Sequence, residues 1–94
     1  MGKIIWTERS KLRLREIYDY ISKDSHEIAP KFVLELIEKA ASLERFSKKG
    51  RIVPELNQPL FRELLWKKYR IIYEIVGEEI WIVTILHQSQ RFKL

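Results

Sequence analysis

The first apolar stripe in the sequence has the three- and four-residue spacing of an amphipathic helix. It consists of Leu14, Ile17, Tyr18 and Ile21. The stripe predicts a helix over residues 8–23, with Thr7 as its N-cap and Glu8 at the positive end of the helix dipole. A short β-branched and aromatic run just before it, residues 3–6, predicts a first strand.

A second stripe keeps the same spacing for four turns and predicts a second helix. Its members are Ala29, Phe32, Val33, Leu36, Ile37, Ala40 and Leu43. Because a proline is tolerated only in the first turn, Pro30 indicates that the regular helix begins near Ala29. Gly50 suits the position just after the helix end. Only a few residues join the two helices, so we expect an antiparallel helical hairpin.

After Gly50 the pattern changes from helical to strand-like. Residues 51–59 contain two prolines and are expected to form a loop. The remainder predicts three strands, over residues 60–65, 69–76 and 79–87, with a two-residue type II′ turn between the last two. The order β-α-α-β-β-β predicts an α+β fold, in which the helical hairpin packs on one face of a small antiparallel sheet.

The two-residue turn predicts the register of the last two strands. Counting back from Val76 opposite Glu79 places Lys68 opposite His87. Because side chains alternate along a strand, Lys68, Arg70 and His87 are expected together at one end of the face without helices.

The preceding strand carries Arg62, whose face depends on the length of the next turn. A three-residue turn over residues 66–68 puts Arg62 on the face of Arg70, whereas a two-residue turn puts it on the helix side. We expect the longer turn, because an arginine under the helices would need a buried partner.

Composition limits the class of protein. The chain has 94 residues, 46% of them hydrophobic, which fits a single domain over residues 1–94 with its own core. No apolar run approaches the roughly 20 residues that a membrane span needs. Cysteine is absent, which excludes a disulfide scaffold and a thiolate zinc site. We therefore expect a cytoplasmic protein with no membrane partner, no metal and no cofactor.

The net charge of +5 lies in one segment. Residues 45–70 carry eight basic and two acidic side chains, whereas residues 1–44 are balanced. A localised excess of this kind favours a polyanionic partner, either nucleic acid or an acidic protein.

Four motifs in this order resemble the RelE/ParE superfamily of toxins. They are residues 50–56 (GRIVPEL), 61–64 (FREL), 69–73 (YRIIY) and 85–87 (ILH), followed by Arg91. The resemblance covers nearly the whole chain. It implies the toxin of a type II toxin–antitoxin pair, neutralised by a cognate antitoxin that also provides contact with operator DNA. The superfamily has two branches: one cleaves messenger RNA on the ribosome without a metal, and the other poisons DNA gyrase without catalysis of its own.

RNA cleavage needs an acid or base and cations that stabilise the phosphate charge. His87 is the candidate acid or base, and Arg70 and Arg62 are the candidate phosphate clamp. Further candidates for phosphate binding and base stacking are Arg51, Lys67, Lys68, Arg91, Phe92 and Trp81.

The expected meeting of Lys68, Arg70 and His87 on one face favours the branch of metal-independent endoribonucleases, with ribosome-bound messenger RNA as target. The alternative is a DNA gyrase poison. Structural roles stay open for the same residues: Arg70 can pin the loop at Glu55, and His87 can be a hydrogen-bonded residue at a strand end.

Overall fold

The computed structural model describes residues 2–94. Its elements are β1 (Lys3–Trp6), α1 (Glu8–Ser22), α2 (Ile28–Ala41), the 3₁₀ turn η1 (Ser42–Glu44), β2 (Arg51–Ile52), β3 (Phe61–Trp66), β4 (Tyr69–Val76) and β5 (Glu79–His87). The predicted α+β class and the order of its main elements are confirmed. The short strand β2 is an addition, formed within the segment expected to be a loop. None of the helices in residues 2–94 is long and apolar enough to cross a membrane.

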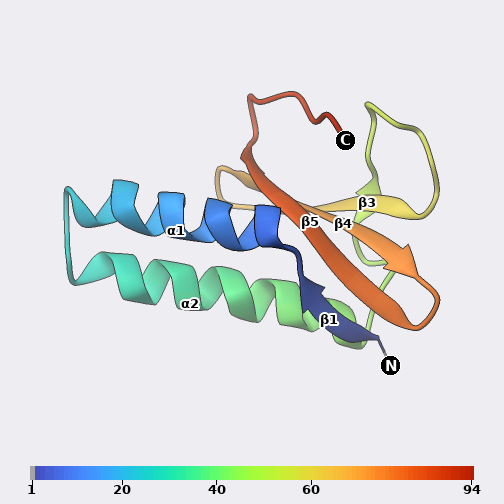
Figure 1. Cartoon of the computed structure of the whole chain (residues 1–94), viewed down its shortest axis with the longest axis horizontal. Coiled ribbons are helices and arrows are strands. Elements are labelled where there is room, and N and C mark those ends of the chain that lie inside the picture. The colour runs from blue at the N-terminus through green and yellow to red at the C-terminus, as the bar shows by residue number, and fades with distance from the viewer. Residues whose placement is uncertain (1) are drawn as a thin grey trace.

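The five strands form one sheet in the order β1-β5-β4-β3-β2. The pairs from β2 to β5 are antiparallel, but β1 lies parallel to β5 at the edge of the sheet. The sheet is therefore mixed, whereas the sequence pattern predicted an antiparallel one. Since a long connection with two helices separates β1 from the strands that follow, no tight turn constrains its direction. The α1–α2 hairpin packs on one face of this sheet (Figure 1).

The helix ends follow local hydrogen bonds. The Thr7 hydroxyl accepts from the Ser10 backbone N–H at 3.1 Å, which confirms the predicted N-cap of α1. The second helix ends at Ala41, well before Gly50. Gly50 instead lies close to the sheet, where a Cβ would come within 2.5 Å of the Glu63 carbonyl oxygen. Glycine is required at this position by close packing, and the predicted helix-ending role is wrong.

Two apolar clusters cover the two faces of the sheet. The larger lies under the helices and contains Ile17, Leu36, Ala40, Leu43, Leu64, Ile71, Tyr73, Ile80, Ile82 and Ile85. The smaller lies on the other face and contains Val53, Ile72, Leu86 and Phe92, with Leu56, Phe61 and Val83 packed against it. Residues after β2 and the C-terminal tail thus cover the face that has no helices. Figure 1 shows this tail leaving the end of β5 and turning back beside the sheet.

A β-bulge divides the β4–β5 pair into two registers. From Val76 opposite Glu79 to Tyr73 opposite Ile82 the pairing is as predicted, and Gly77 has the positive φ of 60° expected in the turn. Beyond the bulge the register shifts by one residue, so that His87 faces Tyr69 and not Lys68. One extra residue reverses the alternation of every side chain that follows it.

Thr7 links this bulge to the start of α1. Its hydroxyl lies 2.8 Å from the Ile82 carbonyl oxygen and 3.0 Å from that of Val83. A bulge leaves backbone groups without their regular partners, and buried carbonyls of this kind need another donor. The same side chain therefore accepts at the cap of α1 and shares its one O–H between the two carbonyls beside the bulge, while the Thr7 backbone N–H also donates to the Ile82 carbonyl oxygen.

Replacing Thr7 with valine should destabilise the protein by about 1–2 kcal/mol, because the cap and the bulge contacts are lost together. Thr7→Ser keeps the hydroxyl and should lose clearly less. Urea denaturation of the two variants measures the difference. Equal stability of Thr7→Val and the wild type would show that the hydroxyl has no such role.

Candidate functional site

Arg70 is buried on the helix-free face, in β4, where two carboxylates surround it. Its Nη1 and Nη2 donate to the two carboxylate oxygens of Glu55, each at 2.7 Å. Its Nε donates to Glu63 Oε1 at 2.6 Å. The Arg70 side chain is only 7% exposed. The residue proposed as half of a phosphate clamp thus already holds two anions, in the bidentate geometry that suits a guanidinium.

Glu63 extends this network across the sheet. Its side chain lies in β3, is fully buried, and pairs through its second oxygen with Arg51 of β2. A buried carboxylate is costly unless cations and donors compensate for the lost hydration. Arg51, predicted from sequence to bind phosphate, is here an ion-pair partner of Glu63.

The C-terminal tail closes the network. The Gln90 carbonyl oxygen accepts from Arg70 Nη1 at 2.8 Å. The Phe92 backbone N–H donates to Glu55 Oε2 at 2.8 Å. The guanidinium therefore joins β4, β3, the loop after β2 and the tail. We call this set of Arg51, Glu55, Glu63 and Arg70 the arginine network.

The charges within the arginine network balance, with two guanidiniums and two carboxylates. The pKa of Glu55 is lowered from 4.5 to about 2, mainly by the hydrogen bonds from Arg70, while burial opposes the shift. The hydrogen bonds that Arg70 donates to Glu55 raise the pKa of Arg70 in turn. An incoming phosphate would have to displace a carboxylate that Arg70 already stabilises.

His87 lies on the opposite face of the sheet from Arg70. Its ring is 6.0 Å from that of Tyr69 between centroids, and its Nδ1 is 3.0 Å from Ser89 Oγ. The expected convergence of Arg70 with His87 is therefore wrong. The physical reason is the bulge, because its extra residue turns His87 to the helix side while Arg70, on β4, keeps its face.

Arg62 also lies on the helix side, because the turn before β4 has two residues. Trp66 pairs with Tyr69, so the predicted three-residue turn is wrong; the positive φ of 52° at Lys67 belongs to this short turn. Arg62 finds its partners in carbonyl oxygens. It donates to Pro59 and to Gly50, each at 3.0 Å. Backbone carbonyl oxygens thus provide the partner that the sequence argument required for an arginine on this side.

The basic segment does not form one continuous patch. Arg51, Arg62 and Arg70 each bind a partner within the fold, although the Arg51 side chain is 61% exposed. Lys67 and Lys68 form the β3–β4 turn, whereas Arg45 lines a hollow with Gly77 at the other end of β4. A charge cluster in the sequence is therefore split between opposite ends of the sheet.

The candidates for base stacking are engaged within the fold. Phe92 is 2% exposed and packs in the smaller apolar cluster, with the Arg9 guanidinium carbon 5.5 Å from its ring centroid. Trp81 is half-buried, and its Nε1 donates to Glu79 Oε1 at 3.0 Å. Arg91 is exposed beside Phe92. Within residues 2–94, no group of three or more His, Asp or Glu side chains is placed to hold a metal ion.

Sequence reasoning did not pair Glu63 with Arg70 and assigned no role to Gln90. The available signal for Glu63 was its place on one strand face between Phe61 and Leu65, where a buried carboxylate must have a cationic partner. Nothing in the local sequence indicated that the Gln90 carbonyl would accept from Arg70, because that contact depends on the path of the tail.

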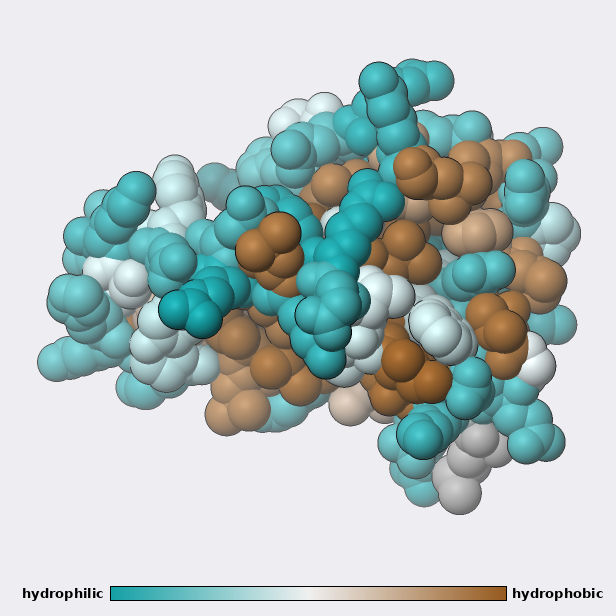
Figure 2. Space-filling view, viewed as in Figure 1, coloured by the Kyte–Doolittle hydropathy of each residue, from teal (hydrophilic) through white to brown (hydrophobic). Residues whose placement is uncertain are grey.

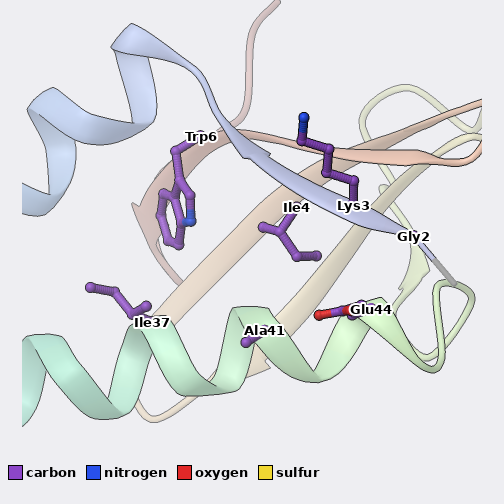
Figure 3. Close-up of a pocket in the computed structure, with 7 residues that line it drawn as sticks. All are labelled: Gly2, Lys3, Ile4, Trp6, Ile37, Ala41 and Glu44. Carbon is purple, nitrogen blue, oxygen red and sulfur yellow. The ribbon is translucent and has the colours of Figure 1, made fainter.

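Hollows lie on the helix side of the molecule. One, of about 440 Å³, separates the edge strand β1 from α2. Figure 3 shows Ile4 and Trp6 pointing from β1 toward α2, where Ile37 points back, while Lys3 points away. In Figure 2, hydrophobic side chains gather between the two helices and around β1.

The second hollow lies between the far end of the helical hairpin and the β3–β4 turn. It has a volume of about 440 Å³ and is lined by Tyr20, Ile21, Phe32, Lys67, Lys68, Tyr69 and His87. An adjoining hollow of about 370 Å³ shares Tyr20, Tyr69 and His87 and continues to Arg13, Glu16, Ile17 and Gln90. We call the two together the aromatic groove. It is here, and not beside Arg70, that His87 lies.

Comparison with known proteins decides the family. Residues 4–92 match the family described as the ParE toxin of the type II toxin–antitoxin system, parDE. The chain belongs to the ParE toxin family. A solved structure titled "Chromosomal ParDE TA system from P. aeruginosa" is similar to this ParE-type chain, with a TM-score of 0.78 and 27% sequence identity over 93% of this chain and 96% of that one. A search of curated proteins found no match.

Membership in this family supports two earlier expectations at a general level. The ParE-type chain is the toxin of a toxin–antitoxin pair, and such a pair implies a cognate antitoxin as partner. The resemblance to the RelE/ParE superfamily and its fold is confirmed.

The arginine network predicts a loss of stability in acid. Glu55 has a lower pKa when folded than when unfolded, so its contribution is complete above about pH 5 and is lost as the pH falls from 4.5 toward 2. Glu55→Gln removes this contribution and should cost about 1–3 kcal/mol at pH 7. The difference in the free energy of unfolding between Glu55→Gln and the wild type, measured by urea denaturation, should be smaller at pH 3 than at pH 7.

Glu38→Gln is the matched control, because Glu38 is exposed and takes part in none of the ion pairs within residues 2–94. It should leave both the stability and its pH dependence nearly unchanged. If Glu55→Gln differed from the wild type in stability by the same amount at pH 7 and pH 3, the lowered pKa of Glu55 would be contradicted.

Proposed function

We propose that this toxin inhibits growth by poisoning DNA gyrase and has no ribonuclease activity of its own. The family supports this reading, because the ParE-like branch of the superfamily acts on gyrase. The gyrase mechanism was the alternative at the level of sequence. The separation of Arg70 from His87 by the sheet is the observation that now favours it.

General acid–base catalysis requires groups that reach the same phosphodiester. A base must lie within about 2.6–3.2 Å of the proton that it removes, and the cationic donors must contact the same phosphate. With Arg70 on one face of the sheet and His87 on the other, one phosphate cannot contact both. Arg70 also holds Glu55 and Glu63, so its charge is already compensated.

The tail gives a second argument against an RNA site on the helix-free face. Phe92 and the residues after β2 cover this face with a small apolar core. A strand of RNA would have to displace that packing before it reached Arg70. A poison that acts by binding a protein needs no such access, because its contacts can use the exposed helical hairpin and strand edges.

The test combines purified toxin with DNA gyrase and supercoiled plasmid. We expect linear DNA to accumulate in proportion to toxin, with an SOS response and intact messages in cells. His87→Ala should change DNA cleavage by no more than a few-fold, because no proton transfer depends on the imidazole. For a ribonuclease, loss of the acid or base would cost about 10²–10⁴ in rate.

Cleaved messages without DNA breaks, abolished by His87→Ala in a folded protein, would contradict the proposal. Circular dichroism of the variant confirms that the fold is retained.

A further inference from the structure

The connection between η1 and β2 carries a run of exposed cations. Residues 45–50 read RFSKKG and contain Arg45, Lys48 and Lys49 without an acidic residue. All three are exposed, and none of the ion pairs within residues 2–94 involves them. We call residues 45–50 the basic loop. Its positive charge is not compensated by partners within the fold.

The buried Tyr73 holds the basic loop in one shape. The Tyr73 hydroxyl donates to the Ser47 carbonyl oxygen at 2.7 Å and accepts from the Gly50 backbone N–H at 2.9 Å. A turn hydrogen bond from the Lys49 backbone N–H to the Phe46 carbonyl oxygen, at 3.0 Å, closes the loop. A loop that is already held in this way loses little backbone freedom when it binds a ligand.

The basic loop also presents an aromatic ring to solvent. Phe46 is 65% exposed and lies outside both apolar clusters of residues 2–94. It is two residues from Lys48 and three from Lys49, on the same turn. Nucleic-acid-binding surfaces combine these two kinds of side chain, because cations contact the phosphates and an aromatic ring packs on a base.

Nearby carboxylates show which cations are available to a partner. Glu44 and Glu78 line a hollow of about 250 Å³ together with Arg45, so acidic charge lies beside this arginine. Lys48 and Lys49 are not part of the lining that the described residues form there. The two lysines therefore carry the positive charge of the basic loop that an anion can meet.

The helix dipole accounts for at most one of these lysines. Lys49 Nζ lies 3.3 Å from the Oγ of Ser42, which is the C-cap residue of α2, and a cation is favourable at this negative end. Lys48 and Phe46 make no side-chain hydrogen bond or ion pair with the described part of the chain. Their exposure together has no explanation in the stability of the fold.

These features fit DNA better than an acidic protein surface. Duplex DNA carries one negative charge for about every 1.7 Å of its axis, so two adjacent lysines on flexible stems can each contact a phosphate. The exposed ring of Phe46 finds a base to pack on. Gyrase, the proposed target, holds DNA, so a poison bound to it has DNA within reach.

We propose that the basic loop binds the phosphate backbone of DNA, with Lys48 and Lys49 on neighbouring phosphates and Phe46 against a base. The DNA is the segment that gyrase holds when the toxin acts. Only this source of the DNA rests on the proposed function, because the contact between the loop and the phosphates needs no gyrase.

Fluorescence anisotropy of the full toxin with a labelled duplex that lacks operator sequence tests the contact without gyrase. The double variant Lys48→Gln with Lys49→Gln removes two phosphate contacts. The slope of the logarithm of affinity against the logarithm of salt concentration should become shallower by about 1.8. The affinity near 0.1 M salt should fall by about tenfold or more.

The matched control is Lys23→Gln with Lys31→Gln, which changes the net charge by the same amount. Both lysines are exposed and take part in none of the ion pairs within residues 2–94. They lie near the connection between α1 and α2, at the opposite end of the helical hairpin from the basic loop (Figure 1). The control should keep the salt slope of the wild type and its affinity within about twofold.

A second pair of variants tests the ring. Phe46→Ala should weaken binding to single-stranded DNA by about fivefold or more, because a stacking partner for a base is lost. Phe46→Tyr keeps a ring at this exposed position and should retain most of the affinity. The same anisotropy assay measures both.

The source of the DNA is tested with gyrase and supercoiled plasmid. The double lysine variant should need about tenfold more toxin than its control to produce the same amount of linear DNA, in line with its loss of DNA affinity. Unchanged cleavage, together with weaker binding of the toxin–antitoxin complex to operator DNA, would instead assign the loop to the operator and contradict gyrase-held DNA as its ligand.

Equal DNA affinity and salt slope for the double lysine variant and its control would overturn the proposal, as would no measurable binding of the wild type at low salt. Normal DNA affinity with weaker binding to DNA-free gyrase would also overturn it, since the loop would then meet an acidic protein surface. A wild-type toxin that binds DNA as predicted but fails to trap gyrase would contradict the proposed function and leave the DNA contact standing. Circular dichroism verifies that all variants are folded.

Discussion

The buried guanidinium of Arg70 is the constraint on which the helix-free side of the sheet depends. It lies between two carboxylates, Glu55 and Glu63, and a tail carbonyl, and each of these comes from a different segment. Breaking a buried pair leaves an uncompensated charge, which typically costs about 3–5 kcal/mol. Arg70 therefore helps to hold both the loop after β2 and the C-terminal tail in place. A side chain that resembles a catalytic cation in sequence acts here as the organising centre of one face.

The bulge in β5 determines on which face of the sheet His87 lies relative to Arg70. Thr7 donates to carbonyls at the bulge while it caps α1, so the start of the helical hairpin and the shift of register are linked. The shift sends His87 toward Tyr69 and leaves Arg70 with its carboxylates. The helix-free face is thus closed by the arginine network and the smaller apolar cluster, whereas the helix side keeps the open aromatic groove. This division favours a protein that acts by binding other proteins over one that cleaves RNA.

The general fold could be predicted from sequence because its signals are local. The apolar stripes, the cap at Thr7 and the glycine turn at Gly77 each require only a few neighbouring residues. The faces of Arg62 and His87 could not be predicted in the same way. A single extra residue in a strand, or one residue fewer in a turn, moves each following side chain to the other face of the sheet. The bulge and the turn length both depend on tertiary contacts. The resemblance led to the correct family. The expected meeting of Arg70 and His87 was wrong, because the bulge moves His87 to the other face of the sheet.

The most direct test of the account is the neighbourhood of the His87 ring in solution. Nuclear Overhauser contacts of the imidazole protons with the aromatic protons of Tyr69 are predicted, since the ring centroids lie 6.0 Å apart. The Phe92 ring protons should show contacts with Val53 and Leu86 on the other face. Contacts from the His87 ring to the Arg70 side chain or to Phe92 would contradict the division of the two faces and restore the case for a ribonuclease centre.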